Sequence, residues 1–465
     1  MGFVLSVLYF VTNYLTPTTL FGPLAPFRIE LILAVLALFV SVPALIKSFI
    51  LKTPQSLALI GLALAVVLSM LIGMRWPGGA VQEILVFIPN AFAYLLVCLH
   101  CKTRTHLQIL VLMLLVVCLF VIGNGYFDLL REIPRSGPPL AESTGGVNRQ
   151  LWNFEHPYLL PMLNSAGEWI YRLRGLGEIN DPNDFAQLIV CVIPLVFIFW
   201  RKKRMFRNFA FVILPVCALL FGMFLTHSRG ALVALMAVAV VSAWRRIGAL
   251  PSLFVAGAVF IAASALNFTG GREISANAGS DRMALWGDGL GLLKAHPFFG
   301  VGFGQMSDKV GQTAHNSIVV CAAELGFFGL YFWTMFLLPT VRDAMVIASP
   351  AKVAEAEPII VESGLFPQAP TSADAIDKAE INRLGRLLVL SLTGLLVAAW
   401  FLSRAFVLTL FLLGGMVEVV YQMALQRGMT APRLRLARVL PYAGVFSVVL
   451  VLLMYIMVRI LNVMH

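Results

Sequence analysis

Apolar residues form long runs along most of the chain, and short polar breaks separate these runs. Many of the runs approach or exceed the roughly 18 to 20 residues that cross a bilayer as a helix. We predict thirteen spans, at 3–16, 29–46, 57–73, 84–99, 107–127, 184–200, 209–226, 230–244, 250–266, 315–339, 387–403, 405–424 and 441–462. A membrane-spanning β-barrel would show short segments of alternating polarity instead. The pattern therefore predicts an all-α polytopic integral membrane protein with about 12–13 transmembrane helices.

The composition agrees with this fold class. Of the 465 residues, 60% are hydrophobic and only 12% are charged, whereas a soluble domain carries roughly 25% charged residues. The mean hydropathy is +0.89. The net charge of +11 could indicate nucleic-acid binding, but basic residues also gather in the cytoplasmic loops of membrane proteins. We favour that reading and predict membrane lipid, and no nucleic acid, as a partner. The six cysteines lie within or beside apolar spans and give no disulfide framework.

The basic loops predict an orientation. With alternating spans, the lysine- and arginine-rich loops all fall on one side, which should be the cytoplasm. These loops contain Lys47 and Lys52, Lys102 and Arg104, Arg201 to Arg207, Arg245 and Arg246, and Arg427 to Arg438. The N-terminus is then cytoplasmic, and two long loops face the opposite, exoplasmic side.

Seven segments follow from this arrangement. They are N-terminal transmembrane helices at 1–127, a first exoplasmic loop at 128–183, central helices at 184–266, a second exoplasmic loop at 267–314, a transmembrane helix at 315–339, a flexible cytoplasmic loop at 340–386 and C-terminal helices at 387–465. We expect short amphipathic helices in both exoplasmic loops.

Arginine is unusually frequent in the two exoplasmic loops. Only Lys294 and Lys309 represent lysine there, whereas the arginines are Arg131, Arg135, Arg149, Arg172, Arg174, Arg272 and Arg282. Arginine on the translocated side works against the topology rule. Guanidinium groups bind phosphate in a bidentate way and stay charged at any working pH. The pattern therefore indicates a site for an anionic substrate.

The first loop contains an aromatic segment and two of these arginines. The segment 152–170 reads as an amphipathic interfacial helix or as the wall of a groove for a lipid-linked substrate. Arg172 and Arg174 follow it, just before Asp181-Pro182. Asp181 suits the N-cap of a helix that has proline in its first position. Arginines beside a helix N-terminus make an anion site.

The second loop and the turn before it hold two further arginines. Arg229 lies in a tight turn between two spans, where it either snorkels to lipid headgroups or binds the substrate. Arg282 begins an amphipathic helix that we expect Ser280 or Asp281 to cap. The glycine-rich segment 297–304 is either a surface turn or a close backbone approach to a ligand.

His315 stands where the second loop meets an apolar span, and Asn316 follows it. Histidine titrates near neutral pH, so His315 is our candidate general base, with Asn316, Glu324 and Asp181 in supporting roles. Glu324 lies inside the same span, at membrane depth, where ionisable groups are functional or paired.

Four motifs within 172–333 carry a family resemblance. They are RLRGLGEINDPNDFAQLIV, FLTHSRGALVALMAV, RMALWGDGLGLLKAHPFFGVGFGQ and AHNSIVVCAAELGFFGLYFW. In order and spacing they resemble the O-antigen ligase and polymerase superfamily. The resemblance implies a bacterial inner-membrane glycosyltransferase with a GT-C-like fold. It also implies an undecaprenyl-diphosphate-linked glycan donor, used on the periplasmic side.

The same resemblance assigns roles to residues. The family's catalytic histidine matches His315, and its diphosphate-binding arginines match Arg172, Arg174 and Arg282, to which we add Arg229. Its ligases need no metal ion, so we expect no cofactor. A diphosphate leaving group needs charge neutralisation, which arginines supply, while His315 takes the proton of the acceptor hydroxyl. Displacement at the anomeric carbon would invert its configuration.

The acceptor is open between three activities. We favour a ligase that transfers the glycan to lipid A–core. The alternatives are a polymerase that extends a growing glycan and a protein O-oligosaccharyltransferase. A lipid-glycan flippase is a different class, for which we would expect polar residues in mid-membrane. The arginines and the histidine gather at one membrane face instead, which favours an enzyme.

Overall fold

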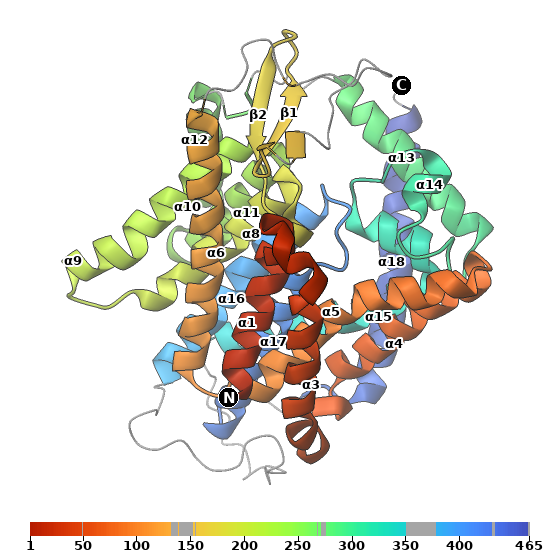
Figure 1. Ribbon diagram of the computed structural model, residues 1–465, viewed down its shortest axis with the longest axis horizontal. Helices are drawn as coiled ribbons and strands as arrows, with labels where there is room; N and C mark the ends of the chain where they lie inside the picture. Colours follow the sequence, from red (N-terminus) through yellow and green to blue (C-terminus); the bar gives the residue numbers. More distant parts are fainter. Residues whose placement is uncertain are drawn as a thin grey trace.

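The computed structural model is a bundle of long helices that run between two ends (Figure 1). It describes residues 1–48, 50–131, 138, 152–153, 155–266, 268–270, 276–349, 378–429 and 433–463. The first residue lies at one end of the bundle, and the end of the last helix lies at the other (Figure 1). An odd number of membrane crossings gives this arrangement.

The helices and strands follow one another along the chain. In order they are α1 (Gly2–Leu15), α2 (Pro17–Leu20), α3 (Ile29–Lys47), α4 (Pro54–Leu68), α5 (Pro77–His100), α6 (Arg104–Leu130), β1 (Leu159–Leu163), β2 (Trp169–Leu173), α8 (Pro182–Val196), α9 (Met205–Asn208), α10 (Leu214–Thr226), α11 (Arg229–Ile247), α12 (Ala249–Ala265), α13 (Ala276–Ala295), α14 (Met306–Val310), α15 (Ser317–Ala348), α16 (Lys378–Ala399), α17 (Leu408–Gln426) and α18 (Leu436–Val463).

The predicted fold class is confirmed. Ten helices in the described part of the chain are long and apolar enough to cross a membrane. The other three predicted spans, 3–16, 230–244 and 250–266, coincide with the shorter apolar helices Gly2–Leu15, Arg229–Trp244 and Leu250–Ala265. The protein is therefore a helical polytopic membrane protein.

Several helices begin with polar caps that the sequence supplies, among them α8, α11 and α15. Asp181 accepts a hydrogen bond from the backbone N–H of Asn183 at 2.7 Å, so the predicted N-cap of α8 is confirmed. Ser228 caps α11 in the same way. Asn316 caps α15 by accepting from the N–H groups of Ile318 and Val319. These caps satisfy backbone donors that a helix start leaves open.

Helix α15 is broken at Gly326, and the glycine-rich segment 297–304 crosses the break. Gly326 has φ 65° and ψ −167°, a conformation open essentially to glycine alone. The N–H of Phe327 donates to the carbonyl of Pro297 at 2.8 Å, and that of Val301 donates to Ala323 at 3.0 Å. A Cβ at Gly326 would collide with the carbonyl oxygen of Phe298. The glycine-rich segment 297–304 thus lies in close contact with the backbone of α15.

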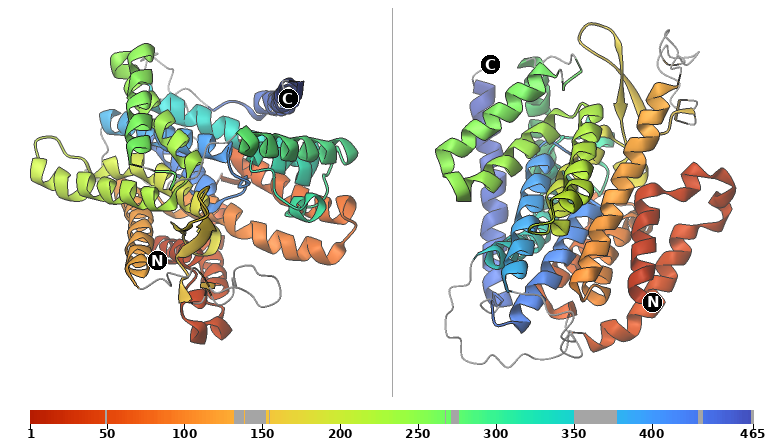
Figure 2. Two further views of the ribbon diagram at one scale, coloured as in Figure 1. Left: turned by 90° about the horizontal axis from the view of Figure 1, so that it is seen from above. Right: turned by 90° about the vertical axis from the view of Figure 1, so that its left-hand side faces the viewer.

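The first exoplasmic loop corrects one prediction. Where we expected an amphipathic helix at 152–170, β1 and β2 form an antiparallel hairpin with Leu159 opposite Leu173. Its connection holds Asn164, whose side chain accepts from two backbone N–H groups, and Gly167 at φ 78°. Such side chains favour a turn between two extended runs. The hairpin projects beyond the helix ends (Figure 2).

Two helix boundaries also differ from expectation. Helix α13 begins at Ala276, so Ser280 and Asp281 lie inside it rather than capping it, and Arg282 lies in its second turn. Helix α15 continues to Ala348, and α16 begins at Lys378, so the predicted loop 340–386 is shorter at both ends. Helices extend into polar sequence that hydropathy does not mark, because backbone hydrogen bonding continues beyond the apolar stretch. Residues 350–377 lie outside the described part.

Candidate functional site

A small polar pocket lies where the starts of α8 and α11 meet α13 and the turn between α16 and α17. It is lined by Asn183, Ser228, Arg229, Gly230, Ala231, Arg282, Phe401 and Leu402, and encloses about 40 Å³. Sites for whole ligands measure about 300–1,000 Å³. The pocket therefore suits one small anionic group of a larger ligand.

Arg229 and Arg282 bring two positive charges to this pocket from different helices. Arg229 is the first residue of α11, whose N-terminus adds a partial positive charge. Arg282 is half-buried. Its burial, and next the nearby Arg229 cation, lower the pKa of its guanidinium. Among the described residues, no carboxylate forms an ion pair with Arg282. Cations placed in this way favour an anionic ligand.

His315 lies close to these charges, just before α15. Its backbone is left-handed, with φ 48°, which is uncommon for a residue other than glycine. Partial burial is the main cause that lowers the pKa of its ring below 6.5. The Arg282 cation adds to this effect, and Asp181 opposes it. The lowered pKa favours the neutral ring, the state that a general base requires.

A turn from Trp400 to Arg404 fixes the chain around His315. The backbone N–H of His315 donates to the hydroxyl of Ser403 at 2.8 Å. Ser317 donates to the carbonyl of Leu402 at 2.7 Å, and the Asn316 side chain donates to that of Trp400 at 3.2 Å. The predicted supporting residue Asn316 therefore acts on the backbone, as a cap and as a tie to this turn.

Arg172 lies directly behind the pocket. It is 4% exposed, and its Nε donates to the carbonyl of Thr226 at 2.8 Å. A terminal nitrogen donates to Oδ1 of Asn183 at 3.0 Å, and the same oxygen accepts from Ser228 at 2.9 Å. Arg172 thus holds the residues that line the pocket, joining β2 to the starts of α8 and α11.

Two predicted site residues have other surroundings. Arg174 donates to the carbonyl of Pro157 at 3.1 Å and to the side chain of Asn153 at 2.6 Å, so it fastens the first loop. Glu324 is 5% exposed and accepts from the backbone N–H of Met306 at 3.3 Å. It braces the segment that crosses the break in α15. Neither residue lines the pocket.

The structure also indicates a site residue that we did not predict from the sequence, Arg404. Its Nε donates to Asp184 at 2.8 Å, and its side chain remains 41% exposed while that of Asp184 is 5% exposed. Arg404 follows Ser403, the residue that contacts His315. Arg404 could have been found in the sequence as a lone arginine between the predicted spans 387–403 and 405–424, on the predicted exoplasmic side.

Of the other arginines in the two predicted exoplasmic loops, the structure describes Arg131, which does not line this pocket. Arg135, Arg149 and Arg272 lie outside the described residues. Arg131 lies 5.0 Å over the ring of Phe127, at the end of α6. Within the described part of the chain, no three histidine, cysteine, aspartate or glutamate side chains gather as metal ligands. That the reaction needs no metal or cofactor stays a prediction.

One stretch of the chain matches a known protein family. Residues 214–334 match the family model for the O-antigen ligase, a stretch that contains Arg229, Arg282 and His315. No curated protein matches the chain. The match confirms the resemblance that the motifs indicated. The match over this part of the chain supports, in general terms, a membrane glycosyltransferase of the O-antigen ligase type that acts on a lipid-linked glycan and an acceptor.

Proposed function

We propose, from membership of the O-antigen ligase superfamily as the premise, that this protein transfers a glycan from undecaprenyl diphosphate to an acceptor sugar hydroxyl. The reaction takes place at the periplasmic face of a bacterial inner membrane. The observation that carries the proposal is the pocket lined by Arg229 and Arg282, together with the proximity of Arg282 to His315, whose pKa it lowers. We favour lipid A–core as the acceptor.

Arg229 and Arg282 bind the diphosphate of the donor. A guanidinium group matches two phosphate oxygens at once and keeps its charge, and the N-terminus of α11 adds its dipole. As the bond from the anomeric carbon to the diphosphate breaks, its electron pair leaves with the phosphate oxygen. The two cations stabilise that charge more strongly in the transition state than in the ground state.

His315 acts as the general base. The acceptor hydroxyl oxygen attacks the anomeric carbon from the face opposite the diphosphate, and the imidazole takes the hydroxyl proton. One carbon–oxygen bond forms while one breaks, so the anomeric configuration inverts. The proposed reaction uses no metal ion, because the arginines neutralise the leaving diphosphate. Asp181 stabilises the imidazolium that results, as its opposing effect on the His315 pKa indicates.

Arg404 is the third cation of the site. The ion pair with Asp184 holds its Nε, and the exposed remainder of the guanidinium lies next to the turn that positions His315. We assign it to the outer phosphate or to the first sugar of the donor. Arg172 keeps Asn183 and Ser228 in place and acts as a positioning residue.

The experiment uses the purified full-length protein with an undecaprenyl-diphosphate-linked glycan. Parallel reactions offer lipid A–core, a second lipid-linked repeat unit or an acceptor protein. Transfer to lipid A–core supports the ligase, and elongation of the second repeat unit supports a polymerase. Transfer to the protein supports an O-oligosaccharyltransferase. Movement of the donor across proteoliposomes without covalent transfer contradicts an enzyme and supports a flippase.

A further inference from the structure

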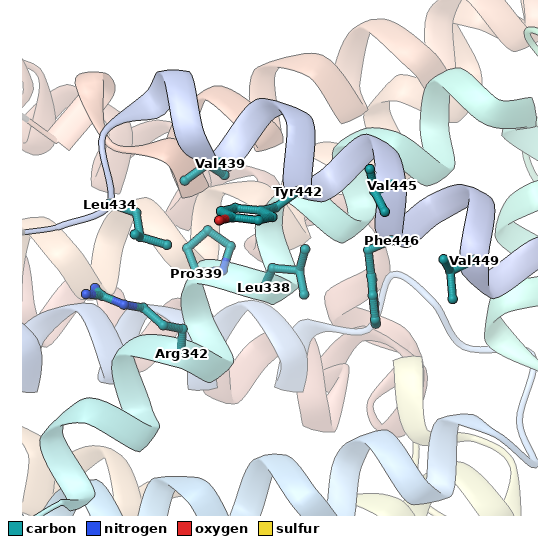
Figure 3. A pocket seen from close by; sticks show the side chains of 9 residues that line it. All are labelled: Leu338, Pro339, Arg342, Leu434, Val439, Tyr442, Val445, Phe446 and Val449. Carbon is teal, nitrogen blue, oxygen red and sulfur yellow. The ribbon is translucent and has the colours of Figure 1, made fainter.

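A second cavity lies between α15 and α18, at the part of α15 far from His315. It measures about 340 Å³, within the roughly 300–1,000 Å³ typical of ligand sites. Figure 3 shows its lining, which is apolar apart from Arg342 and the hydroxyl of Tyr442. The lining residues are Leu338, Pro339, Arg342, Leu434, Val439, Tyr442, Val445, Phe446 and Val449. We call it the α15–α18 groove.

The groove opens toward the membrane. Both helices are candidate membrane spans, and the groove side of α18 is exposed, with Tyr442 at 60%, Val445 at 64% and Val449 at 40%. In a bilayer, hydrocarbon surrounds such a surface. From Val439 to Val449, α18 rises about 15 Å, at roughly 1.5 Å per residue. This rise equals half of the roughly 30 Å hydrocarbon core, which is the depth of one leaflet.

One end of the groove is polar and basic. The Tyr442 hydroxyl points toward the end where Arg342 and Leu434 lie, away from Phe446 and Val449 (Figure 3). Arg435 and Arg438, next in sequence to the lining residues Leu434 and Val439, are exposed.

The nearby acids do not cancel this charge. Asp343 pairs with Arg342, and Glu418 pairs with Arg433. Arg435 and Arg438 form no ion pair among the described residues. The groove end therefore carries net positive charge at the depth of the lipid headgroups.

We propose that the α15–α18 groove binds an anionic diacyl phospholipid, with one acyl chain along α18 and the phosphate at Arg435 and Arg438. Basic pockets between transmembrane helices recognise anionic headgroups in this way. The leaflet is the one opposite the His315 pocket, and basic-loop orientation makes it the cytoplasmic leaflet. This lipid site is separate from the transfer reaction, and the proposal does not depend on which acceptor that reaction uses.

The test measures lipid binding to the full-length protein in detergent by native mass spectrometry. The probes are dioleoyl phosphatidylglycerol, which is anionic, and dioleoyl phosphatidylcholine, which has no net charge. We expect phosphatidylglycerol to bind at least about fivefold more tightly, from the attraction of one arginine alone. Equal affinity for the two lipids overturns the proposal.

Two tryptophan substitutions on α18 locate the acyl chain. Val445→Trp fills the exposed groove and should weaken phosphatidylglycerol binding about tenfold. Val448→Trp is the matched control, because Val448 is 48% exposed on the same helix and does not line the groove. A similar loss in both variants overturns the location.

The headgroup is tested with the exposed arginines, because Arg342→Gln would leave the buried Asp343 without its partner. Arg435→Gln with Arg438→Gln should remove most of the preference for phosphatidylglycerol, while Arg459→Gln at the other end of α18 should keep it. An unchanged preference in the double variant overturns the headgroup assignment. Displacement of phosphatidylglycerol by undecaprenyl phosphate from the wild type, but not from Val445→Trp, assigns the groove to a prenyl chain instead.

Discussion

Half-buried arginines have opposite surroundings in two regions of the molecule, the pocket at Arg282 and the ion pairs of Arg342 and Arg433. In the first region, Arg229 and Arg282 line the same pocket, and Arg229 lowers the pKa of Arg282. In the second region, Arg433 pairs with Glu418, which is 1% exposed, and Arg342 pairs with Asp343 at 2.7 Å. Arg433 and Arg342 are therefore neutralised where they hold helices together, whereas no carboxylate among the described residues forms an ion pair with Arg282 at the pocket.

The difference has a physical basis. A buried acid without a cation costs several kcal/mol, so an internal partner is needed for folding. Two cations that repel each other destabilise the empty site, and an anion relieves that repulsion on binding. The contacts that an arginine makes are thus a better guide to its role than its presence in a loop. Arg174, which is held within the first loop, illustrates this point.

The largest expected effect follows loss of the base. His315→Ala should lower the turnover number for glycan transfer by about 10² to 10⁴, measured with purified protein at saturating donor and acceptor. His296→Ala is the matched control, because His296 is exposed in the same sequence segment and has no assigned role. Equal losses in the two variants would remove His315 from the reaction.

The second effect tests the cationic pocket. Arg282→Ala should lower kcat/KM for the lipid-linked donor by about 10² to 10³, because one charge on the leaving diphosphate loses its partner. Lys294→Ala, at the other end of α13, should leave kcat/KM within about twofold. Arg282→Ala with wild-type kinetics would show that the pocket does not meet the diphosphate.

The paired arginines should behave differently. Arg433→Ala leaves Glu418 buried without a cation and should lower the free energy of unfolding by about 3 kcal/mol, measured by detergent denaturation. Transfer per folded molecule should not change. The double variant Arg433→Met, Glu418→Leu should recover much of the stability. A specific loss of transfer in a stable Arg433→Ala protein would break the comparison between the two regions.

The pH profile sharpens the electrostatics at His315. The neutral ring is active, so transfer falls as pH drops through its pKa, which lies below 6.5. Arg282→Gln removes a cation and should move this acid limb to higher pH. Asp181→Asn removes an anion, keeps an N-cap residue, and should move the limb to lower pH. Shifts in the same direction would contradict the assigned neighbours.

The smallest effect concerns Arg174. Arg174→Ala breaks its hydrogen bonds to Pro157 and Asn153 and should cost about 1 kcal/mol of stability. The transfer rate should stay within about threefold of wild type. A loss as large as that of Arg282→Ala would restore Arg174 to the diphosphate clamp.

The sequence alone predicted the apolar helices and one of the side chains that cap them, Asp181, whereas the predicted cap at Ser280 or Asp281 was wrong. Long apolar runs leave one structural solution in lipid, and Asp181-Pro182 is a local signal for a helix start. The hairpin at 159–173 was missed because its aromatic residues also suit an interfacial helix, and Asn164 and Gly167 were not weighed as a turn.

The site was predictable only in part. His315 and Arg282 stand at visible boundaries between polar and apolar sequence. The role of Arg172 behind Asn183, and that of Arg404 beside His315, depends on contacts between residues up to 220 positions apart. The break at Gly326 likewise results from the segment 297–304 meeting α15, which no local pattern reveals.

The central claim is that Arg282 and Arg229 bind the diphosphate and that His315 carries out the proton transfer. It is tested most directly by measuring the donor dissociation constant of His315→Ala and Arg282→Ala, and single-turnover transfer of each. We predict that His315→Ala binds the donor within about twofold of wild type but does not transfer it, whereas Arg282→Ala binds it at least about tenfold more weakly. Wild-type donor affinity in Arg282→Ala, or wild-type transfer in His315→Ala, would contradict the claim.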